Sequence, residues 1–145
     1  MGLALEQAHK AKELGEVPVG AVAVRNQTLI ATGHNQRRDH QDLLGHAEMI
    51  VMRRAARKLG DWRLEGVDLY VTLEPCPMCS GTMLQARVKT LYFGAENRRE
   101  GCAGSLVNLV DYPGMAHQVR VYGGLMAQQC GQILEEFFQH KRRGG

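Results

Sequence analysis

The chain contains 145 residues, of which 44% are hydrophobic and 23% are charged, and its formal net charge is +3. This length is sufficient for a substantial buried core, so we expect residues 1–145 to form a single domain. The hydrophobic runs are short and interrupted, which excludes a membrane-spanning helix. The first residues lack the charged and apolar regions of a secretory signal, so we expect a cytoplasmic protein.

Hydrophobic periodicity divides the chain into alternating helices and strands. Helices are predicted over residues 3–14, 47–59, 77–87 and 125–141, with a short helix over 105–110. Strands are predicted over residues 19–25, 28–32, 67–73, 90–93 and 118–122. A two-residue turn at Asn26-Gln27 should join the first two strands into a hairpin. Strands that alternate with helices favour a mostly parallel sheet covered on both faces, in three layers α/β/α.

The first and last helices carry apolar residues at helical spacing, which predicts one buried face on each. In the first helix these residues are Leu3, Ala4, Ala8, Ala11 and Leu14. In the last helix they are Leu125, Ile133, Leu134, Phe137 and Phe138.

Two short motifs about thirty residues apart carry groups that bind metals. The first is His46-Ala47-Glu48, and the second contains Cys76 and Cys79 in the sequence Pro-Cys-Pro-Met-Cys. One imidazole and two thiolates supply three of the four ligands of a tetrahedral zinc, and an open fourth position is the catalytic pattern. Glu48 is close enough in sequence to handle protons on a zinc-bound water. This arrangement, H-x-E followed by P-C-x-x-C, is the known signature of zinc-dependent base deaminases.

The spacing within each motif predicts that both motifs begin helices. Positions i and i+3 lie about 60° apart around a helix, so Cys76 and Cys79 can face one point. Positions i and i+2 lie about 200° apart, so His46 must precede the regular turns if Glu48 is to face the same site. A helix N-terminus also favours thiolates.

Other interpretations of these residues stay open at this point. Cys76 and Cys79 could form a redox dithiol, and a structural zinc could be completed by Cys102 or another histidine. Cys102 and Cys130 are more simply explained as small buried residues. The histidines with no fixed spacing to the motifs are expected in loops or at the surface: His34, His40, His117 and His140.

Paired basic residues are candidates for contacts with phosphates. The pairs at 37–38 and 98–99 fall in predicted loops, and the basic tail 141–143 ends the last helix. The pair at 53–54 falls on a helix, where solvated surface charge is the simpler explanation.

Over nearly its whole length, the sequence resembles the bacterial tRNA adenosine deaminases of the cytidine deaminase-like superfamily. The resemblance rests on EVPVGAV at 16–22, GHN at 33–35, HAE at 46–48, TLEPCPMC at 72–79, YFGA at 92–95, GCAGS at 101–105 and the FFQHKRR ending. It implies a cytidine deaminase-like fold with a five-stranded mixed sheet, a homodimer, and one catalytic zinc per chain. It also implies hydrolytic deamination of adenosine to inosine at the wobble position of tRNA anticodon loops.

The resemblance assigns roles to individual residues. His46, Cys76 and Cys79 match the zinc ligands of the family, Glu48 matches the proton shuttle, and Asn35 matches the residue that contacts the base. We expect further substrate contacts from Val17, Ala47, Asn97, Arg98, Lys141 and Arg142. Asn35 could alternatively be only a cap within its loop.

Two segments depart from the pattern of the family. Leu43-Leu44-Gly45 stands where the family usually has Pro and Thr, and Asn97 stands where it usually has Asp. An amide in place of a carboxylate removes repulsion of a polyanion, so single-stranded DNA could also be a substrate. The alternatives to a tRNA enzyme are a deaminase of free bases or nucleotides and a zinc-stabilised binding module without activity.

Overall fold

A computed structural model describes residues 1–38 and 40–144 and contains four α helices and five strands within them. In chain order these elements are α1 (Gly2–Glu13), β1 (Gly20–Arg25), β2 (Thr28–His34), α2 (Ala47–Leu59), β3 (Asp68–Leu73), α3 (Pro77–Ala86), β4 (Thr90–Ala95), β5 (Arg120–Gly123) and α4 (Ala127–Arg143). None of the described helices is long and apolar enough to cross a membrane.

The five strands form one mixed sheet in the order β2-β1-β3-β4-β5. β1 pairs antiparallel with both β2 and β3, whereas β3, β4 and β5 run parallel. The predicted hairpin of β1 and β2 and the predicted five-stranded mixed sheet are confirmed. The sheet is less parallel than expected, because β1 also pairs antiparallel with β3. A two-residue turn can only join antiparallel strands, and Asn26 and Gln27 both adopt the positive φ values, 50° and 63°, of a type I′ turn.

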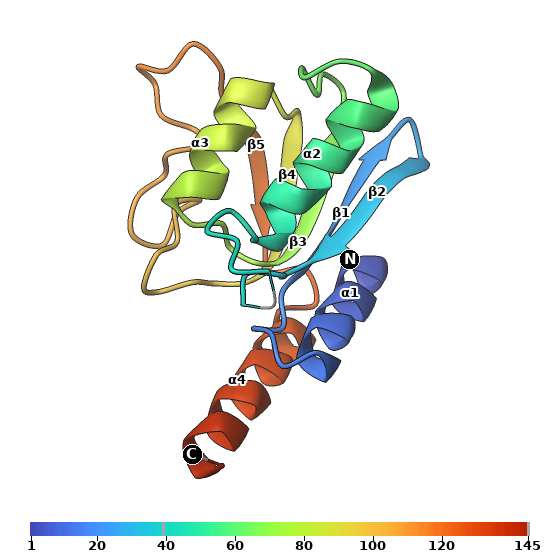
Figure 1. The fold of residues 1–145 in the computed structure, drawn as a ribbon. Coiled ribbons are helices and arrows are strands. Elements are labelled where there is room, and N and C mark those ends of the chain that lie inside the picture. Colours follow the sequence, from blue (N-terminus) through green and yellow to red (C-terminus); the bar gives the residue numbers. More distant parts are fainter. Residues whose placement is uncertain (39, 145) are drawn as a thin grey trace.

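Glycines show which helix covers which face of the sheet. A Cβ at Gly20 would lie 2.0 Å from the carbonyl oxygen of Ala4 in α1, and one at Gly94 would lie 2.4 Å from the sulfur of Cys130 in α4. Gly33 pairs with Ala21, and Ala21 points to the opposite face of the sheet from Gly20. A Cβ at Gly33 would accordingly contact α2. Thus α1 and α4 cover one face, while α2 and α3 lie side by side over the other (Figure 1). This is the predicted three-layer arrangement.

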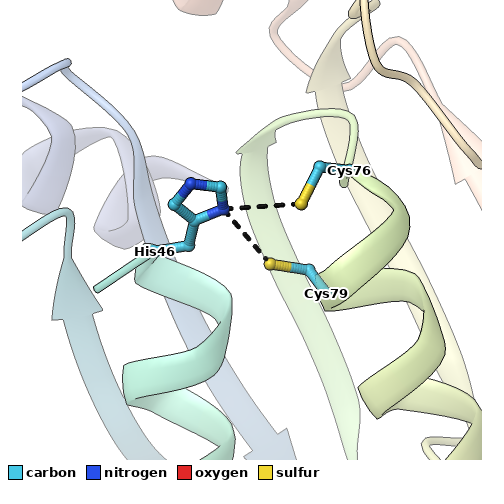
Figure 2. Close-up of side chains that lie close together, drawn as sticks. All are labelled: His46, Cys76 and Cys79. Atoms are coloured by element: carbon cyan, nitrogen blue, oxygen red, sulfur yellow. Dashed lines mark hydrogen bonds between the residues drawn. The ribbon is translucent and has the colours of Figure 1, made fainter. Parts of the chain in front are cut away.

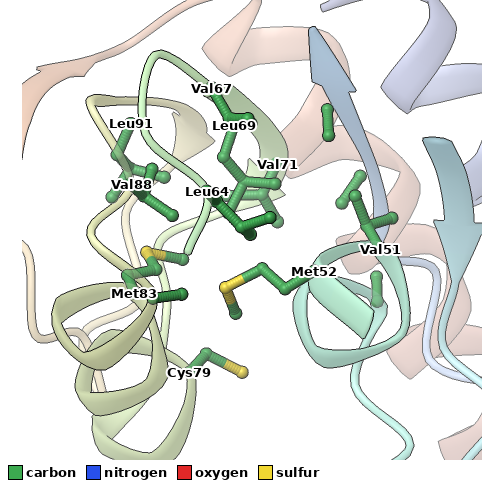
Figure 3. Close-up of a cluster of buried hydrophobic side chains, with 14 of the residues drawn as sticks. Val51, Met52, Leu64, Val67, Leu69, Val71, Cys79, Met83, Val88 and Leu91 are labelled. Carbon is green, nitrogen blue, oxygen red and sulfur yellow. The ribbon is translucent and has the colours of Figure 1, made fainter. Parts of the chain in front are cut away.

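The main hydrophobic core lies between the sheet and the pair α2 and α3. Figure 3 shows Met52 from α2, Val71 from β3 and Met83 from α3 pointing into the same space, whereas Val51 from α2 packs toward β2. These four side chains are at most 3% exposed. The core extends up to Cys79, so the second metal-binding motif is anchored in packed hydrophobic side chains.

Three local predictions were wrong. Residues 105–110 form no helix and contain only one end of an isolated bridge between Ala103 and Asn108. Leu3 and Leu14 are 49% and 55% exposed, because only the alanines of α1 are small enough for its close approach to the sheet. Leu125 precedes α4 rather than contributing to it.

Candidate metal and catalytic site

The two metal-binding motifs meet where α2 and α3 begin. His46 is the N-cap of α2 and Cys76 is the N-cap of α3, and both have an extended backbone. Pro77 occupies the first turn of α3, where a missing N–H breaks no helical hydrogen bond. His46 and both cysteines point toward one another across the gap between the two helices (Figure 2). The predicted position of His46 ahead of the regular helix is confirmed.

The distances between these side chains fit a tetrahedral metal. The Nδ1 atom of His46 lies 3.5 Å from the Sγ atoms of both Cys76 and Cys79. All three potential ligand atoms lie within 4.8 Å of one another. A tetrahedral zinc with bonds of about 2.1 Å to nitrogen and 2.3 Å to sulfur would separate N and S by roughly 3.6 Å. His46, Cys76 and Cys79 could therefore hold one metal ion with little rearrangement.

The electrostatics of the cluster favour a thiolate at Cys76. A hydrogen bond from the Cys79 thiol, together with one from the His46 ring, outweighs burial and lowers the pKa of Cys76 to about 4. The same hydrogen bond to Cys76, assisted by burial, raises the pKa of Cys79. The hydrogen bond to Cys76 also raises the pKa of His46. These interactions favour a negatively charged sulfur at Cys76.

Glu48 lies in the first turn of α2, next to this cluster. It is 4% exposed, and burial raises the pKa of its carboxyl group. A carboxyl group can accept a proton in its ionised form and donate one in its neutral form, so Glu48 has the chemistry of a general base and acid.

The cluster opens into a pocket with a volume of about 770 Å³. Most of the predicted site residues line it: Val17, Asn35, His46, Glu48, Cys76, Asn97, Arg98, Lys141 and Arg142. The two that do not, Ala47 and Cys79, are fully buried behind its wall. Residues from six separate segments of the chain are thereby gathered around one cavity.

Asn35 connects the pocket to the start of α2. Its Oδ1 atom accepts a hydrogen bond from the backbone N–H of Ala47, over 2.8 Å. Asn35 therefore does act as a cap, the alternative considered from the sequence, and it also lines the pocket. The amide nitrogen, which is a donor, is the other polar group of this side chain.

Several pocket residues were not identified as site residues from the sequence. Phe137 and Phe138 were expected to face the core, but they line the pocket, and Phe138 is 42% exposed. Glu16 and Glu74 also line it and are almost fully buried, at 3% and 1% exposed. The carboxylate of Glu16 accepts hydrogen bonds from the backbone N–H of Arg38 over 3.1 and 3.0 Å. The sequence did contain a signal for Glu16 and Glu74, because both lie in segments that carry the family resemblance, EVPVGAV and TLEPC.

The remaining cysteines do not belong to the cluster. Cys102 and Cys130 are buried, and among the described residues only His46, Cys76 and Cys79 form a group that could hold a metal. The thiol of Cys102 donates instead to the carbonyl oxygen of Glu100, over 3.3 Å. A structural zinc completed by Cys102 is therefore not supported, and a redox dithiol does not account for the histidine 3.5 Å from both sulfurs.

Comparison with known proteins identifies the family. Residues 1–142 match the family model of the MafB19-like deaminases. The chain belongs to this family. Similar members include the tRNA-specific adenosine deaminase of Bacillus subtilis (strain 168), 47% identical over 97% of this chain and 87% of the relative. That of Agrobacterium fabrum is 44% identical over 98% of this chain and 93% of the relative.

A solved structure supports the same assignment. It comes from a study of A-to-I editing by tRNA:A34 deaminases at the wobble position of transfer RNA. It superimposes on this deaminase with a TM-score of 0.89 and 43% sequence identity, covering 92% of this chain and 97% of the other. The predicted resemblance and the predicted deaminase fold are both confirmed.

Proposed function

We propose that this protein is a zinc-dependent hydrolase that converts adenosine to inosine at the wobble position of tRNA anticodon loops. The observation that carries the proposal is the convergence of His46, Cys76 and Cys79 beside a buried Glu48 at one end of a large pocket. The near full-length similarity to tRNA-specific adenosine deaminases supports the substrate class.

His46, Cys76 and Cys79 would hold one zinc ion per chain through Nδ1 and the two sulfurs. Zinc at such a site makes hydroxide available at neutral pH, because it lowers the pKa of water to about 7. Cys79 is fully buried and Cys76 lines the pocket, so we expect Cys79 to anchor the metal from behind.

Glu48 would move the protons of the reaction. Its carboxylate would accept one proton from the attacking water and pass it to a ring nitrogen of the adenine. It would then take the second proton from the hydroxyl group added to the ring carbon and pass it to the departing amine. Water and adenosine are thereby converted to inosine and ammonia. A carboxyl group with a raised pKa suits both the basic and the acidic step.

The remaining pocket residues would recognise the substrate. The amide nitrogen of Asn35 would donate to the base, while Val17 and the backbone around Ala47 would border it. Arg98, Lys141 and Arg142 lie at the same pocket and would contact phosphates. An anticodon loop suits such a pocket, because its bases unstack more easily than those of a duplex.

We also propose that the protein is a single-domain cytoplasmic enzyme that acts as a homodimer. Two loops carry large apolar side chains that are exposed in the single chain: Leu43, Leu44, Leu106, Val107, Tyr112 and Met115. Exposed apolar residues of this number are typical of surfaces that a partner covers. Single-stranded DNA remains a proposed second substrate, on the basis of Asn97.

The test is incubation of the zinc-loaded protein with an anticodon stem-loop RNA that carries adenosine at the wobble position. We expect conversion to inosine at that position alone, read by sequencing, and no conversion by Glu48→Ala. Glu48→Ala should retain its zinc, because Glu48 is not one of the three ligands. If the wild-type protein converts free bases or nucleotides but not the stem-loop, the tRNA assignment is wrong. If Glu48→Ala remains active, the proposed mechanism is wrong.

A further inference from the structure

Glu74 has a buried carboxylate that the proposed mechanism does not use. It directly follows β3 and precedes Pro75 and Cys76, and it is 1% exposed. No salt bridge to it occurs among the described residues. A buried carboxylate without a cation is costly unless several hydrogen bonds replace its hydration.

These hydrogen bonds all come from one loop, residues 96–105. The Oε1 atom accepts from the backbone N–H of Asn97, over 3.1 Å, and from the hydroxyl group of Ser105. The Oε2 atom accepts from the backbone N–H groups of Ala103 and Ser105, each over 3.0 Å. Four donors from three positions of the loop therefore converge on a single side chain.

The loop is irregular, and its own hydrogen bonds hold short local turns, such as that from the Gly101 N–H to the carbonyl oxygen of Asn97, over 2.8 Å. Apart from the isolated bridge at Ala103, none of its described residues belongs to a helix or strand after β4 ends at Ala95. Gly101 allows the loop to approach the carboxylate, because a Cβ at this position would lie 2.6 Å from Oε2 of Glu74. The backbone N–H of Cys102 also donates to the carbonyl oxygen of Pro75, over 2.9 Å. The loop is thus joined at two adjacent points to the segment that carries Cys76.

The same loop forms one wall of the pocket. Asn97 and Arg98 line the pocket beside Cys76. The Oδ1 atom of Asn97 accepts from the backbone N–H groups of Arg99 and Glu100, which shapes the turn that displays Arg98. The carboxylate of Glu74 therefore connects this wall of the pocket to the segment that carries Cys76.

We propose that Glu74 is a positioning residue that sets substrate specificity, by holding the 96–105 loop in register with the segment that carries Cys76. Glu74 would affect how nucleic acid is recognised and would not contact the reacting atoms. The proposal rests on the proposed function, because it takes nucleic acid to be the substrate. Charge-assisted hydrogen bonds are about twice as strong as neutral ones, which explains why a carboxylate rather than an amide occupies the position.

The variant that tests this is Glu74→Gln, which keeps the shape of the side chain. An amide offers one acceptor oxygen and turns an NH₂ group toward N–H donors, so part of the cluster must break. Ser105→Ala is a milder second variant, since it removes only the hydroxyl donor. Glu65→Gln, a change at an exposed carboxylate outside the pocket, is the matched control.

Hydrogen–deuterium exchange first tests the positioning itself. We expect the amides of Asn97, Ala103 and Ser105 to exchange at least about tenfold faster in Glu74→Gln, and β3 and α3 to remain as protected as in the wild type. Unchanged exchange in the loop would overturn the proposal. This measurement needs no substrate, so it gives an answer even if the protein edits no RNA.

Kinetics then separates specificity from general damage. For the stem-loop RNA we expect KM to rise by about tenfold in Glu74→Gln, with kcat within about threefold and zinc at one per chain. A trinucleotide with a central adenosine is too short to engage the whole wall, so its kcat/KM should change by less than about threefold. Ser105→Ala should shift KM in the same direction by less, and Glu65→Gln should match the wild type. Equal losses on both RNAs, or loss of zinc, would show a merely structural role and overturn the proposal.

Discussion

The side-chain oxygen of Asn35 accepts a hydrogen bond from the backbone N–H of Ala47, 2.8 Å away, and so ties the loop after β2 to the residue next to His46. The amide group of Asn35 therefore has two separable parts. Its oxygen holds the start of α2, and its nitrogen is the group that we propose to contact the base.

Replacing Asn35 by Asp should separate these two parts. Asp retains the oxygen that caps Ala47 but loses the amide donor, so we expect unchanged zinc content and kcat/KM reduced by roughly 10–100-fold. Asn35→Ala loses both, so it should in addition lower the free energy of unfolding by about 1 kcal/mol. Stem-loop kinetics and denaturant unfolding measure the two effects. Full activity in Asn35→Asp would show that Asn35 is only a cap.

Zinc content should depend on Cys79 and not on Cys102. Cys79→Ala removes one of three ligands, and we expect bound zinc to fall from one per chain to below about 0.1 after dialysis against a weak chelator. Cys102→Ala removes a buried thiol outside the cluster and should keep its zinc. Elemental analysis by mass spectrometry distinguishes them. Equal zinc in the two variants would contradict the proposed ligand set.

Asn97→Asp should shift the preference between RNA and DNA. Its Oδ1 atom already accepts from Arg99 and Glu100, and a carboxylate can accept the same bonds, so the substitution changes charge more than shape. We expect the added negative charge to reduce turnover of single-stranded DNA more than turnover of RNA, by severalfold. The ratio of the two rates, measured at one salt concentration for both proteins, is the test. An unchanged ratio would remove Asn97 as a determinant of substrate range.

The oligomeric state should respond to charges in the 106–107 loop segment. Leu106 and Val107 are 58% and 56% exposed in the single chain, and a dimer would cover such side chains. We expect the Leu106→Glu/Val107→Glu double variant to be monomeric by light scattering at concentrations where the wild type is dimeric. A Leu3→Glu variant, which changes a similarly exposed leucine on α1, should remain dimeric. A wild-type monomer would contradict the proposed homodimer.

The candidate metal ligands could be predicted because each of the two motifs has its own short local spacing. Cys76 and Cys79 are separated by three positions at the start of a helix, and that spacing alone brings both sulfurs to one side. The position of His46 at an N-cap also followed from its distance to Glu48. Hydrophobic periodicity and turn residues predicted the positions of nearly all helices and strands. The type I′ turn at Asn26-Gln27 is one example.

Contacts between segments far apart in the sequence could not be predicted in the same way. The antiparallel place of β1 between β2 and β3 depends on which strands pair, and periodicity within a strand carries no information on its neighbours. Residues 105–110 have a helical pattern, yet the carboxylate of Glu74 holds the adjoining loop in another shape. Phe137 and Phe138 are of a residue type that is common in hydrophobic cores. They line the pocket only because α4 lies beside it.

The sequence by itself thus determined the family and the candidate metal ligands and proton carrier, because each depends on chemical groups at fixed local spacing. The tertiary structure alone decided which loops form the pocket and what holds them there. Glu16 and Glu74 illustrate the reason: each carboxylate binds backbone N–H groups more than twenty residues away. Any residue has such N–H groups, so these partners leave no pattern in the sequence.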